Sequence, residues 1–319
     1  MTVRLKVFVG VCMAAVAAGM YVYLQFAAAM RAAHADIARG SDIVDTAAGP
    51  IEVAEIGTGP ALLMIHGSGG GFDQGLAIAS DLVGAGFHII APSRFGYLRT
   101  PLPADISPGA QADALAALLD ARGIDRATVI GVSAGARSAI ALAVRHPGRI
   151  KALVLVVPAT YAPQASLPDD RGFEFPFVLN VVNAGGAFIW WAAARTKPDL
   201  LGRFLGVPPA VFAEATSRDR VRLMQTIDSV EPLSLRFAGI RIDSQPELDP
   251  PDLASVRAPT LLISARDDLF GTAASATYAA GRIPNAELTL FESGGHLLVG
   301  RSDATRQRIR AFLAQLADQ

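Results

Sequence analysis

Short apolar runs alternate along the chain with longer segments in which apolar residues recur at helical spacing. The short runs are rich in Val, Ile and Leu and end near Gly, Pro or Asp, which is typical of buried strands. This β-α-β-α order predicts an α/β fold in which a mostly parallel central sheet carries helices on both faces. The expected strands lie near 51–56, 61–65, 87–91, 127–131, 151–157, 259–264 and 286–291, and the expected helices near 75–85, 108–122, 134–146, 272–282 and 302–317.

The alternation breaks between Pro158 and Pro250. A connection between two elements of a compact domain is normally much shorter, and this stretch contains helical patterns of its own. We therefore expect a helical cap over residues 159–250, inserted after a strand. Residues 50–158 and 251–319 would form the core to which the cap is attached.

The N-terminal region carries an uncharged apolar run from Val7 to Met30, between Lys6 and Arg31. The run is long enough to cross the hydrocarbon core of a bilayer. The apolar part of a cleaved signal peptide is usually shorter, roughly 7–15 residues. We therefore expect residues 1–31 to form a transmembrane signal anchor.

A linker over residues 32–49 is expected to join this anchor to the core. Arg4 and Lys6 in front of the apolar run favour an N-terminus on the cytoplasmic side. The protein would then be a single-pass membrane protein with its catalytic domain outside the cytoplasm. The alternative is a secreted or periplasmic protein, released by cleavage at an alanine-rich site near Ala29 or Ala35.

Composition excludes several classes of function. The 319 residues include 28 basic and 29 acidic side chains, so the net charge of −1 gives no electrostatic case for binding nucleic acid. The single cysteine, Cys12, excludes an intrachain disulfide. No lysine is placed for a phosphate-binding loop, Phe72 breaks the dinucleotide fingerprint, and no His, Cys and acidic residues have metal-site spacing. We therefore expect no cofactor and no metal.

The segment Gly131-Val132-Ser133-Ala134-Gly135 is the strongest chemical signal in the chain. A strand-like run precedes it and an alanine-rich helix follows it. A Gly-x-Ser-x-Gly between a strand and a helix is typical of a nucleophile elbow, a strained turn that exposes the serine at the carboxyl edge of a sheet. The pattern predicts that Ser133 is a nucleophile.

A serine nucleophile needs a base, and the chain has five histidines. His34 follows the N-terminal apolar run, His88 lies inside a strand, and His146 ends the helix after the serine. His66 directly follows another strand. His296 lies in a glycine-containing loop between the last strand and the last helix, where a rigid scaffold can aim an imidazole. We therefore expect His296 to be the base.

Two adjacent carboxylates, Asp267 and Asp268, follow the buried-type strand near 259–264. This strand should end at the same edge of the sheet as the one that carries Ser133. A carboxylate there would orient the His296 imidazole and stabilise its protonated form. The chain order of serine, acid and histidine is the order associated with the elbow motif.

These features resemble the α/β-hydrolase superfamily, in particular its smaller esterases and C–C bond hydrolases. The resemblance covers roughly residues 50–315 and is carried by the His66-Gly67 turn, the elbow at Ser133, the Asp268 loop and Gly295-His296. It implies a helical cap inserted after the sixth strand. The acid loop of relatives often has the form Gly-x-x-Asp, so the resemblance indicates Asp268 as the acid and Asp267 as its neighbour.

An oxyanion hole requires two backbone N–H groups that point at the developing negative oxygen. One comes from the residue after the nucleophile, here Ala134, and the other from the loop after an earlier strand. The glycine-rich run His66-Gly67-Ser68-Gly69-Gly70-Gly71 lies at that place. We predict the Ser68 amide as the second donor, with Gly69 as the alternative.

A second uncharged run, Phe175 to Ala194, lies inside the expected cap. A membrane crossing there would separate the serine from the histidine, so the two interpretations exclude each other. We expect a cap helix whose Phe188, Trp190 and Trp191 line the substrate pocket or rest on a bilayer surface. Packing within the cap is the alternative.

The sequence therefore predicts a membrane-tethered serine hydrolase that cleaves a carboxylic ester of an apolar or uncharged small molecule. Alternatives are a C–C bond hydrolase with the same triad, a perhydrolase, and a ligand-binding member of the fold without catalysis. Arg94, Arg99 and Arg137 lie near the expected active edge. They are expected to be structural or surface residues, with contact to an anionic substrate as the alternative.

Overall fold

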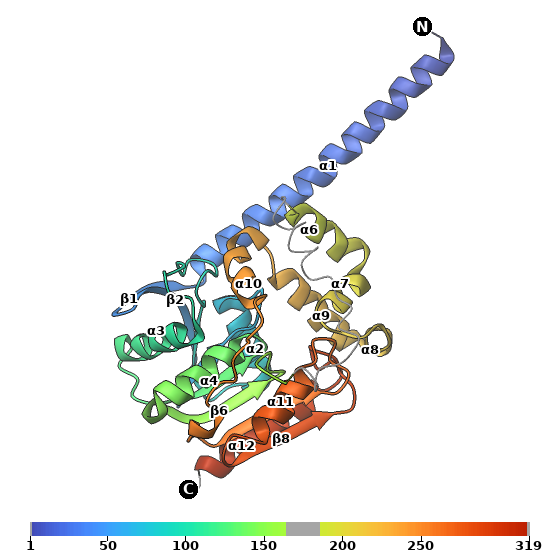
Figure 1. Ribbon diagram of the computed structural model, residues 1–319. Helices are drawn as coiled ribbons and strands as arrows, with labels where there is room; N and C mark the ends of the chain where they lie inside the picture. Colours follow the sequence, from blue (N-terminus) through green and yellow to red (C-terminus); the bar gives the residue numbers. More distant parts are fainter. Residues whose placement is uncertain (1, 164–185, 318–319) are drawn as a thin grey trace.

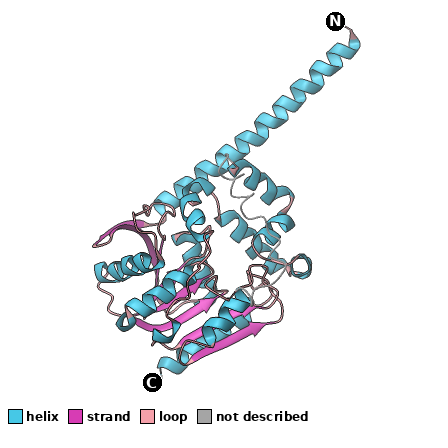
Figure 2. Cartoon of the chain, viewed as in Figure 1, coloured by secondary structure: helices cyan, strands magenta, loops and turns pink. Residues whose placement is uncertain are grey.

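The computed structural model describes residues 2–163 and 186–317, and an eight-stranded sheet forms its centre (Figures 1 and 2). The strand order is β1-β2-β4-β3-β5-β6-β7-β8. All pairs from β4 to β8 are parallel, whereas β2 runs antiparallel to both β1 and β4. The predicted mostly parallel sheet is thus confirmed. The strands are β1 (Asp42–Thr46), β2 (Gly49–Ile56), β3 (Ala61–Ile65), β4 (His88–Pro92), β5 (Ala127–Val132), β6 (Ile150–Val156), β7 (Thr260–Ala265) and β8 (Ala286–Phe291).

Helices cover both faces of the sheet, as the fold prediction requires. The helices α3, α4 and α11 pack against one face and share a buried core with it. The other face is covered by α2 and α12, which contact each other. Alanines supply much of the buried surface of α3 and α4, and their small side chains bring these helices close to the strands. The core helices are α2 (Phe72–Val83), α3 (Pro108–Ala121), α4 (Gly135–Arg145), α11 (Thr272–Ala280) and α12 (Ser302–Ala317).

The central parallel strands end at one edge of the sheet. Ile65 at the end of β3 pairs with Gly131 of β5, and Val156 at the end of β6 pairs with Ile263 of β7. Loops that follow these strands therefore meet above the same edge. In open α/β sheets this edge is where ligands bind.

A group of short helices connects β6 to β7 and lies above the carboxyl edge of the sheet (Figure 1). It has a hydrophobic core of its own, which includes Trp190, Leu201, Ile227 and Val230. These helices lie within the range 159–250 expected for a cap, and residues 164–185 of that range are outside the described residues. They are α6 (Ala187–Thr196), α7 (Pro198–Phe204), α8 (Pro209–Glu214), α9 (Ser217–Ser229) and α10 (Phe237–Asp243).

The N-terminal helix α1 (Val3–Arg39) projects from the body of the protein (Figure 1). Over the described residues, it is the one helix long and apolar enough to cross a membrane, and none of its most apolar window is buried. By length and composition alone, α1 has the character of a membrane span, and a signal sequence has the same character.

The predicted linker over 32–49 is wrong. Its first part continues α1, where Ile37 is buried against Ala54 and Phe72, and its second part forms β1, which extends the sheet beyond β2. The polar residues of Asp42–Thr46 suggested a linker because β1 is an edge strand with one exposed face.

Candidate active site

Ser133 lies in the turn between β5 and α4 with φ at +50°, in the left-handed region. Such a conformation costs a non-glycine residue about 1–3 kcal/mol and persists only where the surroundings enforce it. Here the Ser133 amide donates to the Val156 carbonyl at 3.0 Å, and the Ser133 carbonyl accepts from Ala136 and Ala159 at 3.0 Å each. These bonds hold the turn to the end of β6, which is the geometry that the elbow motif predicts.

The two glycines of the elbow are required because neither position has room for a Cβ atom. A Cβ atom on Gly131 would lie 2.6 Å from the Cβ of Ala139, and one on Gly135 would lie 2.5 Å from the His66 carbonyl oxygen. Any side chain at either position would therefore push α4 away from β5 or from the loop after β3.

Ser133, His296 and Asp268 form one chain of hydrogen bonds. The Ser133 Oγ lies 2.8 Å from His296 Nε2, and His296 Nδ1 lies 2.8 Å from Asp268 Oδ2. Asp268 and His296 are buried, and the His296 ring packs edge-on against Phe270. Since a carboxylate only accepts, Nδ1–H donates to Asp268, and Nε2 is left to accept the hydroxyl proton of Ser133.

The two adjacent carboxylates have different partners. Asp268 accepts from the His296 imidazole, from the Phe270 amide at 2.8 Å and from the Thr272 hydroxyl. Asp267 points to the backbone of the histidine loop instead, where it accepts from the amides of Gly294 at 3.0 Å and Gly295 at 2.8 Å. Asp267 thus fixes the loop that carries His296, whereas Asp268 contacts the imidazole.

One backbone carbonyl of the cap joins both of these loops. The Gly206 oxygen, between α7 and α8, accepts from the His296 amide at 3.1 Å and from the Leu269 amide at 3.2 Å. No sequence pattern pointed to this residue, because its contacts are made by the backbone and lie far away in the chain.

The glycine-rich loop after β3 reaches the elbow. Within residues 2–163 and 186–317, the amides of Ser68 and Ala134 donate no hydrogen bond. The Gly69 amide, by contrast, donates to the Tyr97 hydroxyl at 3.3 Å. Of the two predicted loop donors, Ser68 therefore has the unoccupied amide.

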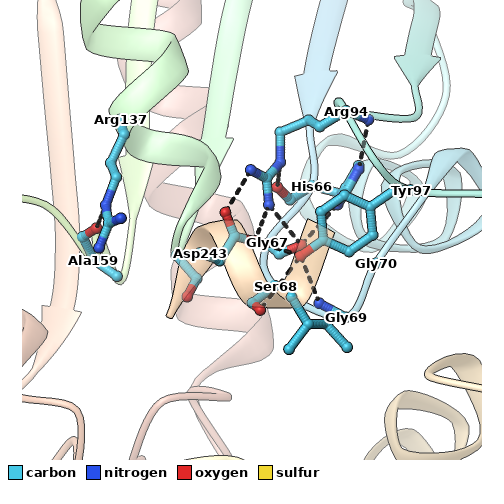
Figure 3. A network of polar contacts seen from close by, with 12 residues as sticks. His66, Gly67, Ser68, Gly69, Gly70, Arg94, Tyr97, Arg137, Ala159 and Asp243 are labelled. Atoms are coloured by element: carbon cyan, nitrogen blue, oxygen red, sulfur yellow. Dashed lines mark hydrogen bonds and ion pairs between the residues drawn. The ribbon is translucent and has the colours of Figure 1, made fainter. Parts of the chain in front are cut away.

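A buried polar network holds this loop in place (Figure 3). Arg94 donates to the carbonyls of His66 and Gly67, and its guanidinium also pairs with both oxygens of Asp243 at 2.8 and 2.5 Å. Tyr97 donates to the same carboxylate. Since Asp243 is the last residue of α10, the network ties the glycine-rich loop to the cap.

Burial shifts the titration of this network. Desolvation, helped by the positive charge of Arg94, lowers the pKa of His66 well below its ordinary value. The neutral ring donates from Nδ1 to the Gly67 carbonyl at 2.7 Å and accepts at Nε2 from the Arg94 amide at 3.0 Å. Desolvation and the neighbouring Asp243 charge raise the pKa of Tyr97, so its hydroxyl remains a donor. Sequence reasoning missed Tyr97 and Asp243, which carry no motif.

The three arginines near the active edge have protein partners. Arg94 belongs to the network above. Arg99 pairs with the buried Glu52 at 2.7 Å. Arg137 donates to the carbonyls of Ala159 at 3.1 Å and Gln245 at 2.7 Å (Figure 3 shows the Ala159 bond). All three are structural, as expected.

A cavity of about 140 Å³ lies beside Ser133, between the elbow and the cap. Trp190 lines it, together with Val230, Leu233 and other apolar side chains. Among the described residues that line it, His296 is the only ionisable one. The cavity is therefore suited to an uncharged, apolar group.

Phe188 and Trp191 are absent from the residues that line this cavity, so of the predicted roles the pocket contact is met there by Trp190 alone. Both contact Phe26 of α1, with ring centroids 5.4 and 5.7 Å apart. They lie on the side of α6 that faces α1, because the helical twist directs Trp190 the other way.

A second cavity of about 520 Å³ adjoins the first. It lies between α2, α9 and the loop after β8, and His296 and Thr226 line both cavities. Its two lining arginines are paired with acids: Arg222 lies 2.9 Å from Asp81 and Arg218 lies 3.3 Å from Asp303. Ser133 lines the smaller cavity and is absent from the residues that line the larger one.

The described part of the chain contains no group of three or more His, Cys, Asp or Glu side chains that could hold a metal ion.

Comparisons with known proteins agree with this geometry. A family model described as the alpha/beta hydrolase fold matches residues 60–183. The chain is 27% identical to 2-hydroxymuconate semialdehyde hydrolase of Pseudomonas putida, over 81% of this chain and 89% of that protein. It is also 27% identical to a 2-hydroxy-6-oxononadienedioate/2-hydroxy-6-oxononatrienedioate hydrolase of Dechloromonas aromatica, over 74% of this chain and 80% of that protein.

A solved structure adds to this similarity. The alpha/beta hydrolase fold protein from Nakamurella multipartita superposes with a TM-score of 0.68 at 29% identity, over 86% of this chain and 98% of that one. The family model, these relatives and the sheet topology lead to the same conclusion: the chain is a hydrolase with the α/β-hydrolase fold.

Proposed function

We propose that the protein is a serine hydrolase that cleaves a carboxylic ester of an uncharged, largely apolar small molecule through an acyl-enzyme on Ser133. The observation that carries the proposal is the chain of 2.8 Å contacts from Ser133 through His296 to Asp268. A serine is activated when a base lies within hydrogen-bond distance of its hydroxyl and a third group orients that base.

In the proposed reaction, the Ser133 Oγ attacks the ester carbonyl carbon while His296 Nε2 takes the hydroxyl proton. The resulting imidazolium is stabilised by Asp268 and gives this proton to the leaving alkoxide oxygen as the C–O bond breaks. Water then attacks the acyl-enzyme, losing a proton to His296, and the Ser133 oxygen recovers it when the acid departs.

The tetrahedral intermediates need donors for their negative oxygen. We assign the amides of Ala134 and Ser68, which are unoccupied and adjoin the nucleophile, whereas the Gly69 amide already donates to Tyr97. The loss of one such donor typically costs about 2.7–4 kcal/mol of transition-state stabilisation.

The two cavities suggest how an ester would lie. Since His296 must protonate the leaving oxygen, the alcohol part belongs on the side of His296, and His296 borders both cavities. The acyl part would occupy the 140 Å³ cavity beside Ser133, and the alcohol would extend toward the 520 Å³ cavity. The proposed substrate therefore combines a short apolar acyl group with a larger alcohol.

C–C bond hydrolysis is the second candidate, because the relatives from Pseudomonas putida and Dechloromonas aromatica are named as hydrolases of compounds that contain no ester bond. Their names describe carboxylate substrates. Among the described residues that line the smaller cavity, the one basic side chain is His296, whose Nε2 is already in contact with Ser133, so a desolvated carboxylate there would lack a free counter-charge, which is energetically costly. This argues for the ester.

Labelling with a fluorophosphonate probe tests the serine chemistry. The wild-type protein should be labelled at Ser133, and the Ser133→Ala variant should not. A folded wild-type protein that resists the probe would contradict the proposal and favour a ligand-binding protein without catalysis.

Kinetics on two substrate classes separate the enzyme candidates. Turnover of p-nitrophenyl esters of rising chain length should be highest for short acyl groups. If the enzyme cleaves a 2-hydroxy-6-oxo-dienoate and hydrolyses none of the esters, C–C bond hydrolysis replaces ester hydrolysis as the proposed activity.

We also infer that α1 is retained as a single-pass anchor, with the hydrolase domain outside the cytoplasm. The packing of Phe26 and Ile37 against the body supports retention, since a cleaved protein would lose the first of these contacts. Intact-mass measurement of the protein from the membrane fraction tests this. A mature chain that begins after Ala29 or Ala35 would establish a signal sequence instead.

A further inference from the structure

We propose that the outward surface of α6 and α7 docks on an anionic lipid bilayer beside α1. We define this cap surface by three apolar residues, Phe188, Ile189 and Leu200, and by the basic residues around them. The proposal rests on retention of α1 and is independent of the reaction proposed for Ser133.

The position of α1 brings this surface to the membrane. Residues 3–25 of α1 are exposed, and the helix begins to be covered at Phe26. At about 1.5 Å per residue, the exposed part is roughly 33 Å long, close to the hydrocarbon thickness of about 30 Å. The bilayer boundary would therefore fall near Phe26.

Phe26 is also the point at which α1 meets the cap. Its ring lies 5.4 Å from Phe188 and 5.7 Å from Trp191, and Phe188 and Trp191 stack at 5.9 Å. Figure 1 shows α6 beside α1 at the level where α1 leaves the body. The cap surface is thus continuous with the apolar surface of α1.

The apolar residues of the cap surface are open to their surroundings. Phe188 is 38%, Ile189 57% and Leu200 59% exposed. Exposure of these apolar side chains to water, next to the exposed apolar surface of α1, would be unfavourable. The interfacial region of a bilayer would cover them.

Charge favours anionic headgroups. Arg195, Lys197 and Arg203 are exposed on α6, on α7 and on the turn between them, and the acid of this segment (residues 187–204) is Asp199. Arg195 donates to the Trp191 carbonyl at 3.1 Å and its guanidinium lies over the Trp191 ring, whereas Lys197 and Arg203 take part in no ion pair among the described residues. The Lys197 and Arg203 side chains are therefore available to lipid phosphates. A basic side chain near an anionic leaflet contributes about 1 kcal/mol.

This docking would bring the catalytic cavity close to the lipid. Trp190 lines the cavity beside Ser133, while Phe188 and Ile189 of the same helix face outward. A single helix would then separate the cavity from the bilayer, which suits an ester that partitions into lipid.

The chain offers a direct test, because Cys12 is its only cysteine. In a Cys12→Ser background, Ile189→Cys carries an environment-sensitive NBD label on the cap surface. Leu248→Cys, on the loop after α10 and 78% exposed, is the matched control. The full-length protein is reconstituted into vesicles that contain phosphatidylglycerol, and flotation verifies insertion through α1.

The label at position 189 should shift to the blue in these vesicles and be quenched severalfold more by nitroxide lipids than the label at 248. Equal, water-like emission at both positions in floated protein would overturn the proposal. Quenching at 189 that is the same in purely zwitterionic vesicles would overturn the electrostatic part. The readout needs no turnover, so a Ser133→Ala background should give the same result, and a failed hydrolase proposal would leave it unchanged.

Discussion

The core and the cap both line the cavity beside Ser133, but they are held there by different interactions. On the core side, backbone hydrogen bonds between strand ends fix Ser133, and Asp267 fixes the histidine loop through two amides. The cap is joined to the core by backbone bonds at the Gly206 carbonyl and also by ion pairs of two buried arginines, Arg94 with Asp243 and Arg236 with Asp73. The reacting groups thus depend on the architecture of the sheet, whereas the wall that faces the substrate depends on side-chain pairs that substitution can remove.

This difference has a physical consequence. Backbone bonds survive most side-chain substitutions, so the geometry of the elbow is robust. A buried ion pair is costly to desolvate and strongly destabilising when one partner is lost. Substitutions in the core machinery should therefore abolish turnover in a folded protein, and substitutions in the joints should loosen the cap.

The largest effect is expected for Ser133→Ala and His296→Ala. Each should lower kcat by up to about 10⁶-fold, by analogy with another triad in which the members act as a unit. The double variant should be little worse than either single one. Thermal unfolding should show that every variant is folded. If the losses of kcat in the two single variants add up in the double variant, Ser133 and His296 do not act as a unit.

The adjacent carboxylates provide the next comparison. Asp268→Asn should lower kcat by about 10⁴-fold, because an amide stabilises the wrong tautomer of the imidazole. Asp267→Asn loses acceptor strength toward two amides and should cost far less. Equal losses of kcat in the two variants would withdraw the assignment of Asp268.

The joint between core and cap can be broken at Asp243. Asp243→Asn leaves Arg94 buried without its counter-charge, so the free energy of unfolding should fall by about 3–5 kcal/mol in urea titration. Asp113→Asn is the matched control, since Asp113 also binds an arginine, Arg145, with both oxygens, but at the surface. It should cost no more than about 1 kcal/mol.

The cap should set acyl selectivity. Val230→Ala enlarges the cavity beside Ser133, so kcat/KM for an ester with a longer acyl chain should rise relative to kcat/KM for the acetate ester. Each additional methylene group that the enlarged cavity accommodates should raise this ratio by about 10-fold or more. Val221→Ala, which borders only the second cavity and is 58% exposed, should leave this ratio unchanged. A ratio that responds equally to both variants would show that the acyl group lies elsewhere.

The smallest effect concerns Glu231 in the cap. Desolvation raises the pKa of its carboxyl from 4.5 to about 7, although Arg195 opposes this shift. Between these values the folded protein keeps a proton that the unfolded chain has released, so stability falls as pH rises. The fall in unfolding free energy from pH 5 to 7 should therefore be smaller in Glu231→Gln than in the wild type, whereas Glu214→Gln should not alter it.

The fold and the elbow could be predicted because their signals are local. The strand, turn and helix around Ser133 follow one another within a short segment, and the flanking glycines are demanded by contacts of that same turn. Asp243, Tyr97 and Gly206 could not be found in this way. Their roles depend on contacts with residues far away in the chain, and the last acts through a backbone carbonyl that any residue carries.

Residue periodicity also has limits at surfaces. Trp190 and Trp191 are neighbours in an apolar run, so the sequence treats them alike, but the twist of α6 directs one to the cavity and the other to α1. The polar residues of β1 resemble a linker for the same reason: an edge strand with an exposed face lacks the apolar pattern of a buried one.

The Gly206 carbonyl has a consequence for protein engineering. Since it accepts from the amides of both Leu269 and His296, a cap transplanted from another hydrolase must bring an acceptor to this same point. A chimaera whose transplanted cap lacks this acceptor would leave the amides of Leu269 and His296 without a hydrogen-bond partner. Successful grafts should therefore keep the Gly206 turn from the host.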